Sequence, residues 1–315
     1  IFATMNIQQF QYVLAVVGSK NFEDAAERCF ITQSTLSTMI GRFENEIGIK
    51  IFNRKTKPVS ITVEGKKIIE RLRIITHEVG ALQNVIQEIK GEMVGELRIG
   101  IIPTVAPYLL PLFLPDFAGK FPNVKIIVKE MPTAQIREQL KNRTLDVGML
   151  AIPIEDSELT EYPLFSEPFM VYDCSGKELP KTVAIEDLDY SNLWLLHEGH
   201  CLRTQVFQIC EQSHLNPKAN SNFEFESGSM GSLLNFTKAS GGMTIVPQLA
   251  INHLPISEHQ CLVPFTQPVP VRSIGLLTHK HFVKKRLIDE LQKTVKNSVD
   301  GLIPKIGREQ IINPI

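Results

Sequence analysis

The first fifty residues place apolar and polar positions at the spacing of short amphipathic helices. In MNIQQFQYVLAVVGS the apolar stripe consists of Ile7, Phe10, Val13, Leu14 and Val17. NFEDAAERCF starts with Asn21, a candidate N-cap followed by acidic residues. ITQSTLSTMIGRFENEIG contains a second candidate cap, Thr32, and an apolar stripe made of Leu36, Met39, Ile40, Phe43 and Ile47. We predict three helices joined by tight turns.

The third of these helices opens with small hydrogen-bonding side chains away from its apolar stripe. A short helix, a tight turn and such a helix are typical of a helix-turn-helix, whose second helix enters the major groove of DNA. Gln suits bidentate contact with adenine, and Ser and Thr reach base edges or phosphates. The candidate DNA-binding residues are Thr32, Gln33, Ser34, Thr35 and Ser37.

A basic hairpin is predicted next, in IKIFNRKTKPVSIT. Its Arg54, Lys55 and Lys57 could lie along a phosphate backbone. Between Lys50 and Arg73 eight basic residues stand against two acidic ones, although the whole chain has a net charge of -1. This local charge suits a polyanion. A solvated hairpin without a nucleic-acid partner is the alternative.

EGKKIIERLRIITHEVGALQNVIQEIKG predicts one long helix with a narrow apolar seam. The seam recurs in steps of four and three residues, as in a heptad repeat, at Ile68, Leu72, Ile75, Val79, Leu82, Ile86 and Ile89. A second copy of the chain is the simplest partner for this seam, and a dimer matches a two-fold related DNA site. The alternative is that the seam packs on its own chain.

From Glu96 onward, short apolar runs alternate with helical stretches. The predicted strands are ELRIGIIP, NVKIIVKEM, LDVGMLAI, FMVYD, LWLLHEG, MTIVP and SIGLLT, and predicted helices include LLPLFLPDFAGKF, TAQIREQLKNR and GSLLNFTKAS. This alternation predicts an α/β domain with a largely parallel sheet, long enough for two subdomains with a cleft. Ligands in such folds bind beyond the carboxyl ends of strands, which makes Thr104 and the HEGHC segment candidates.

Composition narrows the class of protein. No apolar run has the roughly 18 to 20 residues of a membrane span. The opening IFATMNIQQF lacks a basic-then-apolar leader pattern, so we expect a start at Met5 and a cytoplasmic protein. Five cysteines at irregular spacings do not suggest a secreted disulfide framework. Any disulfide is therefore expected to be transient, redox-sensing or catalytic.

Two of the five cysteines, Cys201 and Cys210, stand nine positions apart in GHCLRTQVFQIC. His200, Arg203 and a helix N-terminus would raise the thiolate fraction of Cys201, whereas an apolar setting keeps Cys210 protonated. Cys201 is the candidate for attack on an oxidant and Cys210 the candidate resolving thiol. In a continuous helix they would lie roughly 13 Å apart. Because a disulfide needs Cα atoms within about 7 Å, oxidation would have to unwind the segment.

Two other interpretations remain for this pair. Cysteine is among the most buried residue types, so both could be core thiols, as Cys29, Cys174 and Cys261 are expected to be. A metal site is less favoured, because the HExxH spacing and a second cysteine pair are missing from the cluster of His197, His200, Cys201, Cys210 and His214. We expect no metal and no cofactor.

The stretch NFEDAAERCFITQSTLSTMIGRFENEIGIKIFNRKTKPVSITVEGKKII resembles the N-terminal domain of the LysR-type transcriptional regulators. GGMTIVPQLAI and the order of strands and helices are similar to the effector domain of that family, which resembles periplasmic binding proteins. The resemblance covers roughly residues 5 to 300. It implies an α+β two-part chain, with a winged helix-turn-helix over 5–62, a linker helix for dimerisation over 63–91 and a two-subdomain effector domain over 96–300. It also implies double-stranded DNA and RNA polymerase as partners of a homodimer or homotetramer.

HEGHCLRTQ and IPTVAPYLLP are similar to segments of the members of this family that respond to hydrogen peroxide. By this resemblance Cys201 reacts with peroxide, Cys210 is its disulfide partner, and thioredoxin or glutaredoxin is the reductant. The implied peroxide pocket consists of Thr104, Thr133, His200, Arg203 and Arg272. Two positions depart from the pattern, because Thr204 stands where many relatives have Asp and Ala134 where some have His.

Two other functions compete with a peroxide sensor. A LysR-type regulator could bind a small organic effector in its cleft, with merely structural cysteines, and replacing Cys201 by serine would then leave its response intact. A thiol peroxidase would turn over with a reductant, but no peroxidase needs the DNA-binding half. We therefore expect a peroxide-sensing transcriptional regulator that is not an enzyme.

Overall fold

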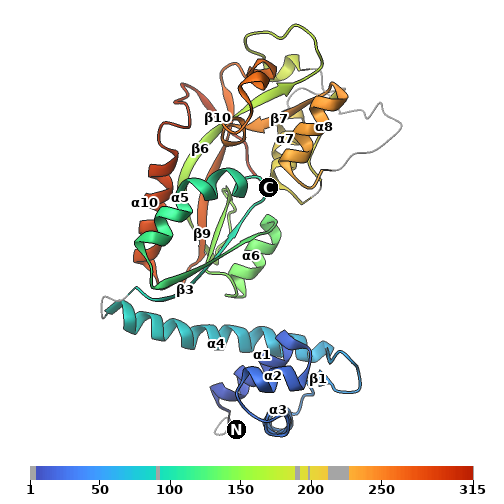
Figure 1. Ribbon diagram of the computed structural model, residues 1–315, viewed down its shortest axis with the longest axis vertical. Helices are drawn as coiled ribbons and strands as arrows, with labels where there is room; N and C mark the ends of the chain where they lie inside the picture. The colour runs from blue at the N-terminus through green and yellow to red at the C-terminus, as the bar shows by residue number, and fades with distance from the viewer. Residues whose placement is uncertain (1–4, 90–92, 189–191, 198, 212–226, 315) are drawn as a thin grey trace. The chain divides into compact units, whose positions relative to one another are not determined.

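The computed structural model of the 315-residue chain describes all residues except 1–4, 90–92, 189–191, 198, 212–226 and 315 (Figure 1). The chain divides into two compact units, an N-terminal one up to residue 91 and a second that holds nearly all the rest. Among the described residues, no helix is both long and apolar enough to cross a membrane.

The N-terminal unit contains the three predicted helices and the predicted hairpin. Its elements are α1 (Ile7–Ser19), α2 (Phe22–Arg28), α3 (Gln33–Ile47), β1 (Phe52–Asn53), β2 (Ser60–Ile61) and α4 (Val63–Ile89). β1 and β2 pair antiparallel. Asn21 and Thr32 cap α2 and α3 as expected, each accepting a backbone N–H through its side chain. The cap of α1, Asn6, was not anticipated; it forms a capping box with Gln9.

The apolar stripe of α3 lies at the centre of the hydrophobic core of this unit. Leu36, Ile40 and Phe43 are fully or almost fully buried, and they pack with the apolar face of α1 and with α2. The Phe10 and Phe43 rings meet edge to face with centroids 5.6 Å apart. The opposite face of α3 therefore remains available to a partner.

Glu44, on the buried side of α3, ties that helix to the hairpin. Its side chain is 1% exposed. Its Oε1 accepts the backbone N–H groups of Ile51 at 2.8 Å and Phe52 at 3.2 Å, while Arg54 and Lys50 lie 3.4 and 3.5 Å from Oε2. One buried carboxylate thus fixes the position where the hairpin leaves α3.

The second unit is built on one mixed sheet of eight described strands, in the order β4-β3-β5-β9-β6-β7, with β10 beside β9 and β8 beside β6. The strands are β3 (Gly95–Ile101), β4 (Val124–Glu130), β5 (Val147–Ile152), β6 (Leu159–Asp173), β7 (Met243–Pro247), β8 (Leu262–Pro264), β9 (Val269–His279) and β10 (Glu309–Ile311). The helices are α5 (Ala106–Lys120), α6 (Thr133–Lys141), α7 (Cys201–Glu211), α8 (Met230–Ser240), α9 (Gln248–Ile251) and α10 (Lys285–Val299), with short 3₁₀ helices η1 (Ile185–Asp187) and η3 (Ile256–Cys261).

The α/β architecture predicted for this unit is confirmed, with two corrections. Among the described strands, the sheet is parallel between β3 and β4, between β3 and β5 and between β9 and β10. The long strands β6 and β9 run antiparallel to each other, β9 also to β5, and β6 also to β7 and β8. The expected largely parallel sheet was therefore wrong. The described residues of the run LWLLHEG form no strand either, and of these Leu193 and Leu196 form isolated bridges. Its apolar side chains instead pack on the core of the second lobe.

Two hydrophobic cores give this unit two lobes, which Figure 1 shows as its lower and upper parts. The first core lies around β3, β4, β5, α5 and α10, and the second around β7, α7 and α8. β6 and β9 run side by side through both lobes (Figure 1), and Glu167 and Arg272 stand opposite each other where they pass from one to the other. This crossing positions the site described below.

Replacing Glu44 with alanine would leave the buried N–H groups of Ile51 and Phe52 without an acceptor. We expect the variant to lose about 3 kcal/mol of stability in the N-terminal unit. Lys50→Ala, which removes only an exposed partner of the same carboxylate, should change stability by less than about 0.5 kcal/mol. Hydrogen exchange of peptides from α3 and the hairpin in the full chain measures both effects. Equal protection in all three proteins would contradict the role of Glu44.

Candidate functional site

The structure exposes the polar face of α3. Gln33, Ser34 and Thr35 lie in its first turn and are exposed, and Thr32 caps that turn with its hydroxyl 3.3 Å from the Thr35 N–H. Ser37, one turn further along, is half-buried because Arg54 of the hairpin donates to its hydroxyl at 2.7 Å. The residues proposed to face DNA therefore share one surface with the hairpin.

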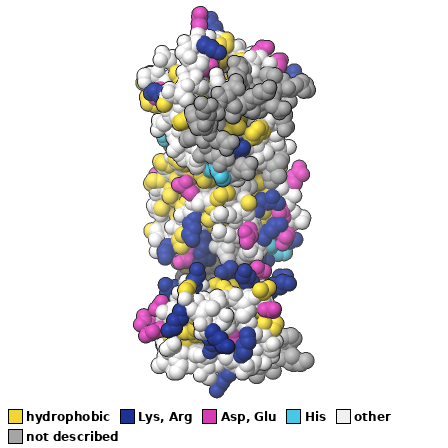
Figure 2. All heavy atoms as spheres, turned by 90° about the vertical axis from the view of Figure 1, so that its right-hand side faces the viewer, with side chains coloured by type: hydrophobic (Ala, Val, Ile, Leu, Met, Phe, Trp, Pro, Cys, Tyr) yellow, Lys and Arg dark blue, Asp and Glu magenta, His cyan; other side chains and the backbone are white. Residues whose placement is uncertain are grey.

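The three basic residues of the hairpin differ in their surroundings. Lys55 and Lys57 are exposed. Arg54 contacts Ser37 and Glu44, and its guanidinium lies 4.9 Å from the centre of the Phe22 ring, so it fastens the hairpin to the helices. Lys and Arg side chains also gather on the face of this unit seen in the lower part of Figure 2.

The seam of α4 is divided between two environments. Leu72 is 4% exposed and Ile68 half-buried, and both pack on the core of the N-terminal unit. Further along, Ile75, Leu82 and Ile86 are 42%, 61% and 45% exposed. Val79 is half-buried, and the side chain of Ile89 lies outside the described residues. Among the described seam residues, those of the first half are covered by this chain, whereas Ile75, Leu82 and Ile86 are exposed and available to a second chain.

In the second unit, Cys201 is the first residue of α7, and its thiol is buried in the core of the first lobe. Burial raises the pKa of this thiol. The charge of Arg272, the hydroxyl of Thr133 and the N–H groups of Leu202 and of Cys201 itself act in the opposite direction and favour the thiolate. Burial has the larger effect, so the resting residue is a protonated thiol surrounded by groups that stabilise its anion.

Arg272 is itself completely buried and fully engaged. Its Nε donates to Glu167 Oε1 at 2.9 Å, and a second guanidinium nitrogen lies 2.8 Å from the same oxygen. The other Glu167 oxygen accepts the Leu249 N–H at 2.7 Å. Arg272 also donates to the hydroxyl and to the carbonyl oxygen of Thr104, each at 3.2 Å. The two charges therefore have hydrogen-bond partners throughout, which a buried ion pair requires.

Thr133, the first residue of α6, supplies a further polar group to this site. Its hydroxyl is close enough to the Cys201 thiol to lower the pKa of that group. The same oxygen is buried and has no partner of full hydrogen-bonding geometry among the described residues. A buried hydroxyl without a partner costs free energy. This position therefore favours a small polar molecule that can hydrogen-bond to Thr133.

His200 and Arg203 contribute less charge to the thiol than their positions in the sequence suggest. Burial, and then the neighbouring His197, lowers the pKa of His200, so its imidazole is mainly neutral near pH 7. Arg203 donates to the carbonyl oxygen of Leu196 at 2.9 Å, and its guanidinium lies 5.2 Å from the centre of the Phe207 ring. The cation whose charge reaches Cys201 is Arg272.

Cys210 lies on the same helix but in the core of the second lobe, where it is 1% exposed. No disulfide joins it to Cys201. Between the two, the buried Gln205 donates to the carbonyl oxygen of Ile312 at 2.8 Å, and Ile312 donates to the carbonyl oxygen of Val271. The C-terminal segment thus holds α7 in place. The two thiols are anchored in different hydrophobic cores.

The two departures from the pattern of the relatives, Thr204 and Ala134, are both at exposed positions. Of the cluster considered for a metal, His214 lies outside the described residues. Within the part of the chain that the structure describes, there is no group of three or more His, Cys, Asp or Glu side chains that could hold a metal ion.

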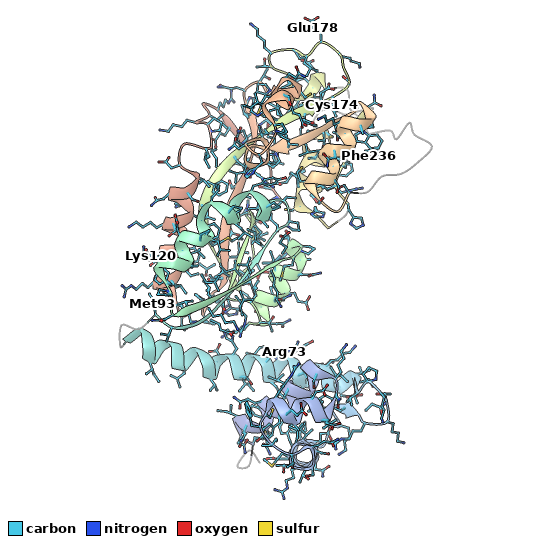
Figure 3. All side chains as sticks on the ribbon, viewed as in Figure 1. Arg73, Met93, Lys120, Cys174, Glu178 and Phe236 are labelled. Atoms are coloured by element: carbon cyan, nitrogen blue, oxygen red, sulfur yellow. The ribbon has the colours of Figure 1, made fainter. Side chains whose placement is uncertain are left out.

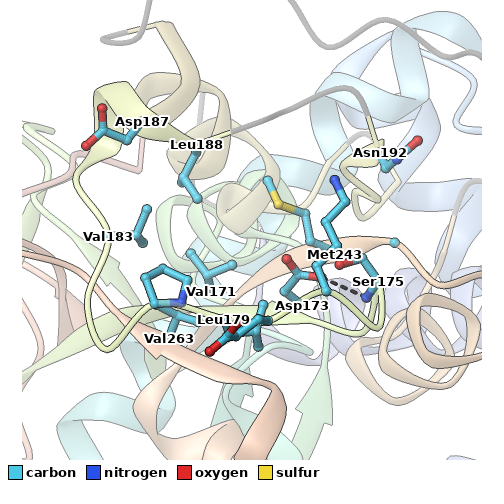
Figure 4. Close-up of a pocket in the computed structure, with 14 residues that line it drawn as sticks. Val171, Asp173, Ser175, Leu179, Val183, Asp187, Leu188, Asn192, Met243 and Val263 are labelled. Atoms are coloured by element: carbon cyan, nitrogen blue, oxygen red, sulfur yellow. Dashed lines mark hydrogen bonds between the residues drawn. The ribbon is translucent and has the colours of Figure 1, made fainter.

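A separate cavity of about 200 Å³ lies in the second lobe, away from Cys201 (Figure 4). Val171, Val183 and Leu188 form part of its apolar wall. Asp173 and Ser175 lie side by side at one end, where the carboxylate accepts the Ser175 N–H at 2.8 Å. None of the residues predicted for the peroxide pocket lines this cavity.

Glu167 is the residue of the site that the sequence did not reveal. It lies in SEPFMV, which reads as an ordinary strand start. Arg272 could have indicated such a residue, since an arginine inside the apolar run VPVRSIGLL requires a buried carboxylate nearby. The sequence does not show which acidic residue provides that carboxylate.

Models of two families match this chain. Residues 7–66 match the bacterial regulatory helix-turn-helix protein, lysR family, and residues 90–299 match the LysR substrate binding domain. The second match spans the lobes that hold Cys201 and Cys210, and the first spans the hairpin and all three capped helices.

Relatives extend this similarity over nearly the whole chain. A hydrogen peroxide-inducible genes activator of Dickeya chrysanthemi is 34% identical over 97% of this chain and 99% of its own length. The DNA-binding transcriptional dual regulator OxyR of Escherichia coli (strain K12) is 30% identical over 98% of this chain and its full length. A full-length OxyR variant of Pseudomonas aeruginosa is similar in structure, with a TM-score of 0.75, 26% identity and coverage of 93% and 98%.

A peroxide-bound OxyR variant of Corynebacterium glutamicum is also similar, with a TM-score of 0.59, 25% identity and coverage of 94% of this chain and 93% of its own. The similarities cover both units, and the family models match both. The chain therefore belongs to the LysR family of bacterial helix-turn-helix regulators.

Proposed function

We propose that this chain is a cytoplasmic transcriptional regulator that senses hydrogen peroxide through a reversible disulfide between Cys201 and Cys210. One observation carries the proposal: a buried thiol lies at the start of a helix, beside the Arg272 charge and the buried Thr133 hydroxyl. Relatives named as hydrogen peroxide-inducible genes activators support it. In this proposal, residues 96–300 form the domain that senses peroxide. Residues 63–91 form the dimerisation helix, and residues 5–62 bind DNA.

In the first step, the Cys201 sulfur attacks one oxygen of hydrogen peroxide as its thiolate. The O–O bond breaks, a C–S–OH sulfenic acid forms, and the second oxygen leaves as water with the proton released by the thiol. The positive charge of Arg272 stabilises both the thiolate and the oxygen that leaves. Thr133 and Thr104 supply hydroxyls that can hold peroxide beside the thiol.

In the second step, the Cys210 thiol displaces the hydroxyl from the Cys201 sulfur, which forms the disulfide and releases a second water. In α7 the two residues are separated by nine helical positions, roughly 13 Å at about 1.5 Å per residue. A disulfide requires Cα atoms within about 7 Å. Since each thiol is anchored in its own hydrophobic core, α7 must unwind and one core must release its cysteine. A dithiol reductant of the thioredoxin or glutaredoxin class would reverse the change.

The readout is binding of double-stranded DNA by the α3 surface. Gln33, Ser34 and Thr35 would contact base edges or phosphates, and Lys55 and Lys57 would follow the backbone. The exposed half of the α4 seam would pair with a second chain, and two such dimers would form the homotetramer. RNA polymerase is the expected partner at promoters.

The organic-effector alternative has one observation in its favour, the cavity of Figure 4. That cavity is formed by the second lobe alone and contains neither cysteine of the pair. A thiol peroxidase has no comparable support, because every turnover would require α7 to unwind on oxidation and to refold on reduction. Loss of the response on replacing Cys201 separates the peroxide sensor from the effector regulator.

Peptide mapping of the reduced full-length protein after one equivalent of hydrogen peroxide should show a Cys201–Cys210 disulfide that thioredoxin or glutaredoxin reverses. Cys201→Ser should abolish both the disulfide and the peroxide response. Cys210→Ser should leave Cys201 trapped as a sulfenic acid, because the resolving thiol is missing. If all the described thiols stay reduced at this dose, the sensor proposal fails.

Thr133→Val keeps the shape of the side chain and removes its hydroxyl. We expect oxidation of Cys201 by peroxide to slow at least about tenfold, because one hydrogen-bonding group for the peroxide and thiolate is lost. Thr133→Ser, which keeps the hydroxyl, should react at close to the parent rate. Quenched-flow alkylation of Cys201 measures both rates, and equal rates for the valine and serine variants would remove Thr133 from the mechanism.

Leu82→Glu introduces a charge at a seam residue that is 61% exposed. We expect this variant to stay folded and to lose self-association, because an unpaired charge in an apolar helix pair is costly. Analytical ultracentrifugation gives the mass, and Leu82→Met, which keeps an apolar side chain at the same position, is the control. An unchanged oligomer in Leu82→Glu would show that α4 does not form the interface.

A further inference from the structure

A second pair of cysteines, Cys174 and Cys261, lies at one point of the second lobe. Cys174 directly follows β6, and Cys261 directly precedes β8. These strands are antiparallel, with Tyr172 opposite Leu262. Continuing this register by one residue puts Asp173 opposite Cys261 and Cys174 diagonally next to it. The spacings between strands and along a strand then give a Cα separation of about 6 Å for the two cysteines. A disulfide spans about 4.4 to 6.8 Å, so this backbone needs little movement to be bridged.

The two thiols lie close to each other, and a small oxidant can reach them. Both cysteines pack on the hydrophobic core of the second lobe, and the Cys261 thiol and the Tyr172 hydroxyl each influence the pKa of the Cys174 thiol. Both cysteines are half-buried, in contrast to the fully buried Cys201 and Cys210. Figure 3 labels Cys174 at the end of β6, in the second lobe.

The surrounding contacts hold this pair in register. The Tyr172 hydroxyl donates to Glu258 Oε2 at 2.9 Å, and Lys238 of α8 donates to Glu258 Oε1 at 2.6 Å. Glu258 belongs to η3, the short helix that ends with Cys261. β6, α8 and η3 are thus joined at one carboxylate, which keeps Cys261 beside Cys174.

The setting makes this pair slow to react. Burial raises the pKa of the Cys174 thiol to about 11, so little thiolate is present near pH 7. Among the residues that the structure describes, the site has no counterpart of Arg272, since the nearby Lys238 is paired with Glu258. A low thiolate fraction slows attack on peroxide without preventing it.

We propose that Cys174 and Cys261 form a second disulfide under sustained exposure to hydrogen peroxide, joining the end of β6 to the η3–β8 segment. The oxidant is the one that the proposed function invokes, but the bond does not depend on Cys201. This disulfide forms at a higher dose of peroxide than the Cys201–Cys210 disulfide, and it stabilises the second lobe.

The chemistry balances with one peroxide. One thiolate attacks a peroxide oxygen, the O–O bond breaks, and the other oxygen leaves as water, giving a sulfenic acid. The second thiol then displaces the hydroxyl and releases another water as the S–S bond forms. The two thiols together lose two electrons and two protons, and one hydrogen peroxide is reduced to two waters.

Peptide mapping of reduced full-length protein over increasing peroxide tests the proposal. We expect a Cys174–Cys261 linked peptide that appears only in excess peroxide, at least about tenfold more slowly than oxidation of Cys201, and that a dithiol reverses. It should also form in Cys201→Ser. In Cys261→Ser it should disappear, and Cys29, in the N-terminal unit, should stay unlinked in every sample.

A second measurement separates this bond from general oxidation. After peroxide treatment in the Cys201→Ser background, the urea midpoint followed by Trp194 fluorescence should rise, and the rise should be absent when Cys261→Ser is added. The proposal is overturned if both thiols stay reduced, if each is oxidised to a sulfinic acid without linkage, or if either pairs with another cysteine. Absence of the Cys201–Cys210 peptide, with the second linkage present, counts against the proposed function alone.

Discussion

The buried ion pair between Arg272 and Glu167 is the interaction on which the rest of the site depends. It joins β9 to β6 at the point where both strands pass between the lobes. Neither side chain is exposed, and removing one partner would leave an uncompensated buried charge, which costs about 3–5 kcal/mol. The same pair fixes Thr104 and the start of α9 through Leu249. It therefore holds the strands, Thr104 and α9 in place around Cys201 and brings the positive charge of Arg272 to its thiol.

The ion pair also explains how Cys201 can be both stable and poised to react. Burial favours the neutral thiol, and part of the charge of Arg272 is balanced by Glu167. When negative charge develops on the sulfur or on a departing oxygen, Arg272 and the N–H groups at the start of α7 already face it. The stabilisation is realised mainly during the reaction, which limits oxidation of the resting protein.

In the proposed function, the helix α7 converts this chemistry into a change of shape. Its two cysteines belong to different hydrophobic cores, and Gln205 between them holds the C-terminal segment. A bond between the two sulfurs is incompatible with that helix, whereas the pair at Cys174 and Cys261 needs little rearrangement. One chain thus carries one thiol pair suited to switching and another suited to reinforcement.

Local patterns predicted the parts of this fold that depend on local physics. The stripe of Leu36, Ile40 and Phe43 and the cap at Thr32 defined α3, because periodicity and capping are visible within a few residues. LWLLHEG failed as a strand because its contact with β7 is a single bridge between Leu193 and Met243, while its apolar side chains pack on the core of the second lobe. Periodicity and capping do not predict contacts between distant segments, and Glu167 is 105 residues from Arg272 along the chain. For the same reason, the residues beside Cys201 in the sequence did not show that the charge of Arg272 reaches its thiol.

Unwinding of α7 is the central claim, and hydrogen exchange of that helix tests it most directly. Peptides that cover residues 201–211 are compared in the reduced protein and after one equivalent of peroxide. We predict that the amides of these peptides lose protection when the Cys201–Cys210 disulfide forms, while the amides of peptides from β3 and β5 keep their protection. A disulfide that forms with the protection of α7 unchanged would contradict it.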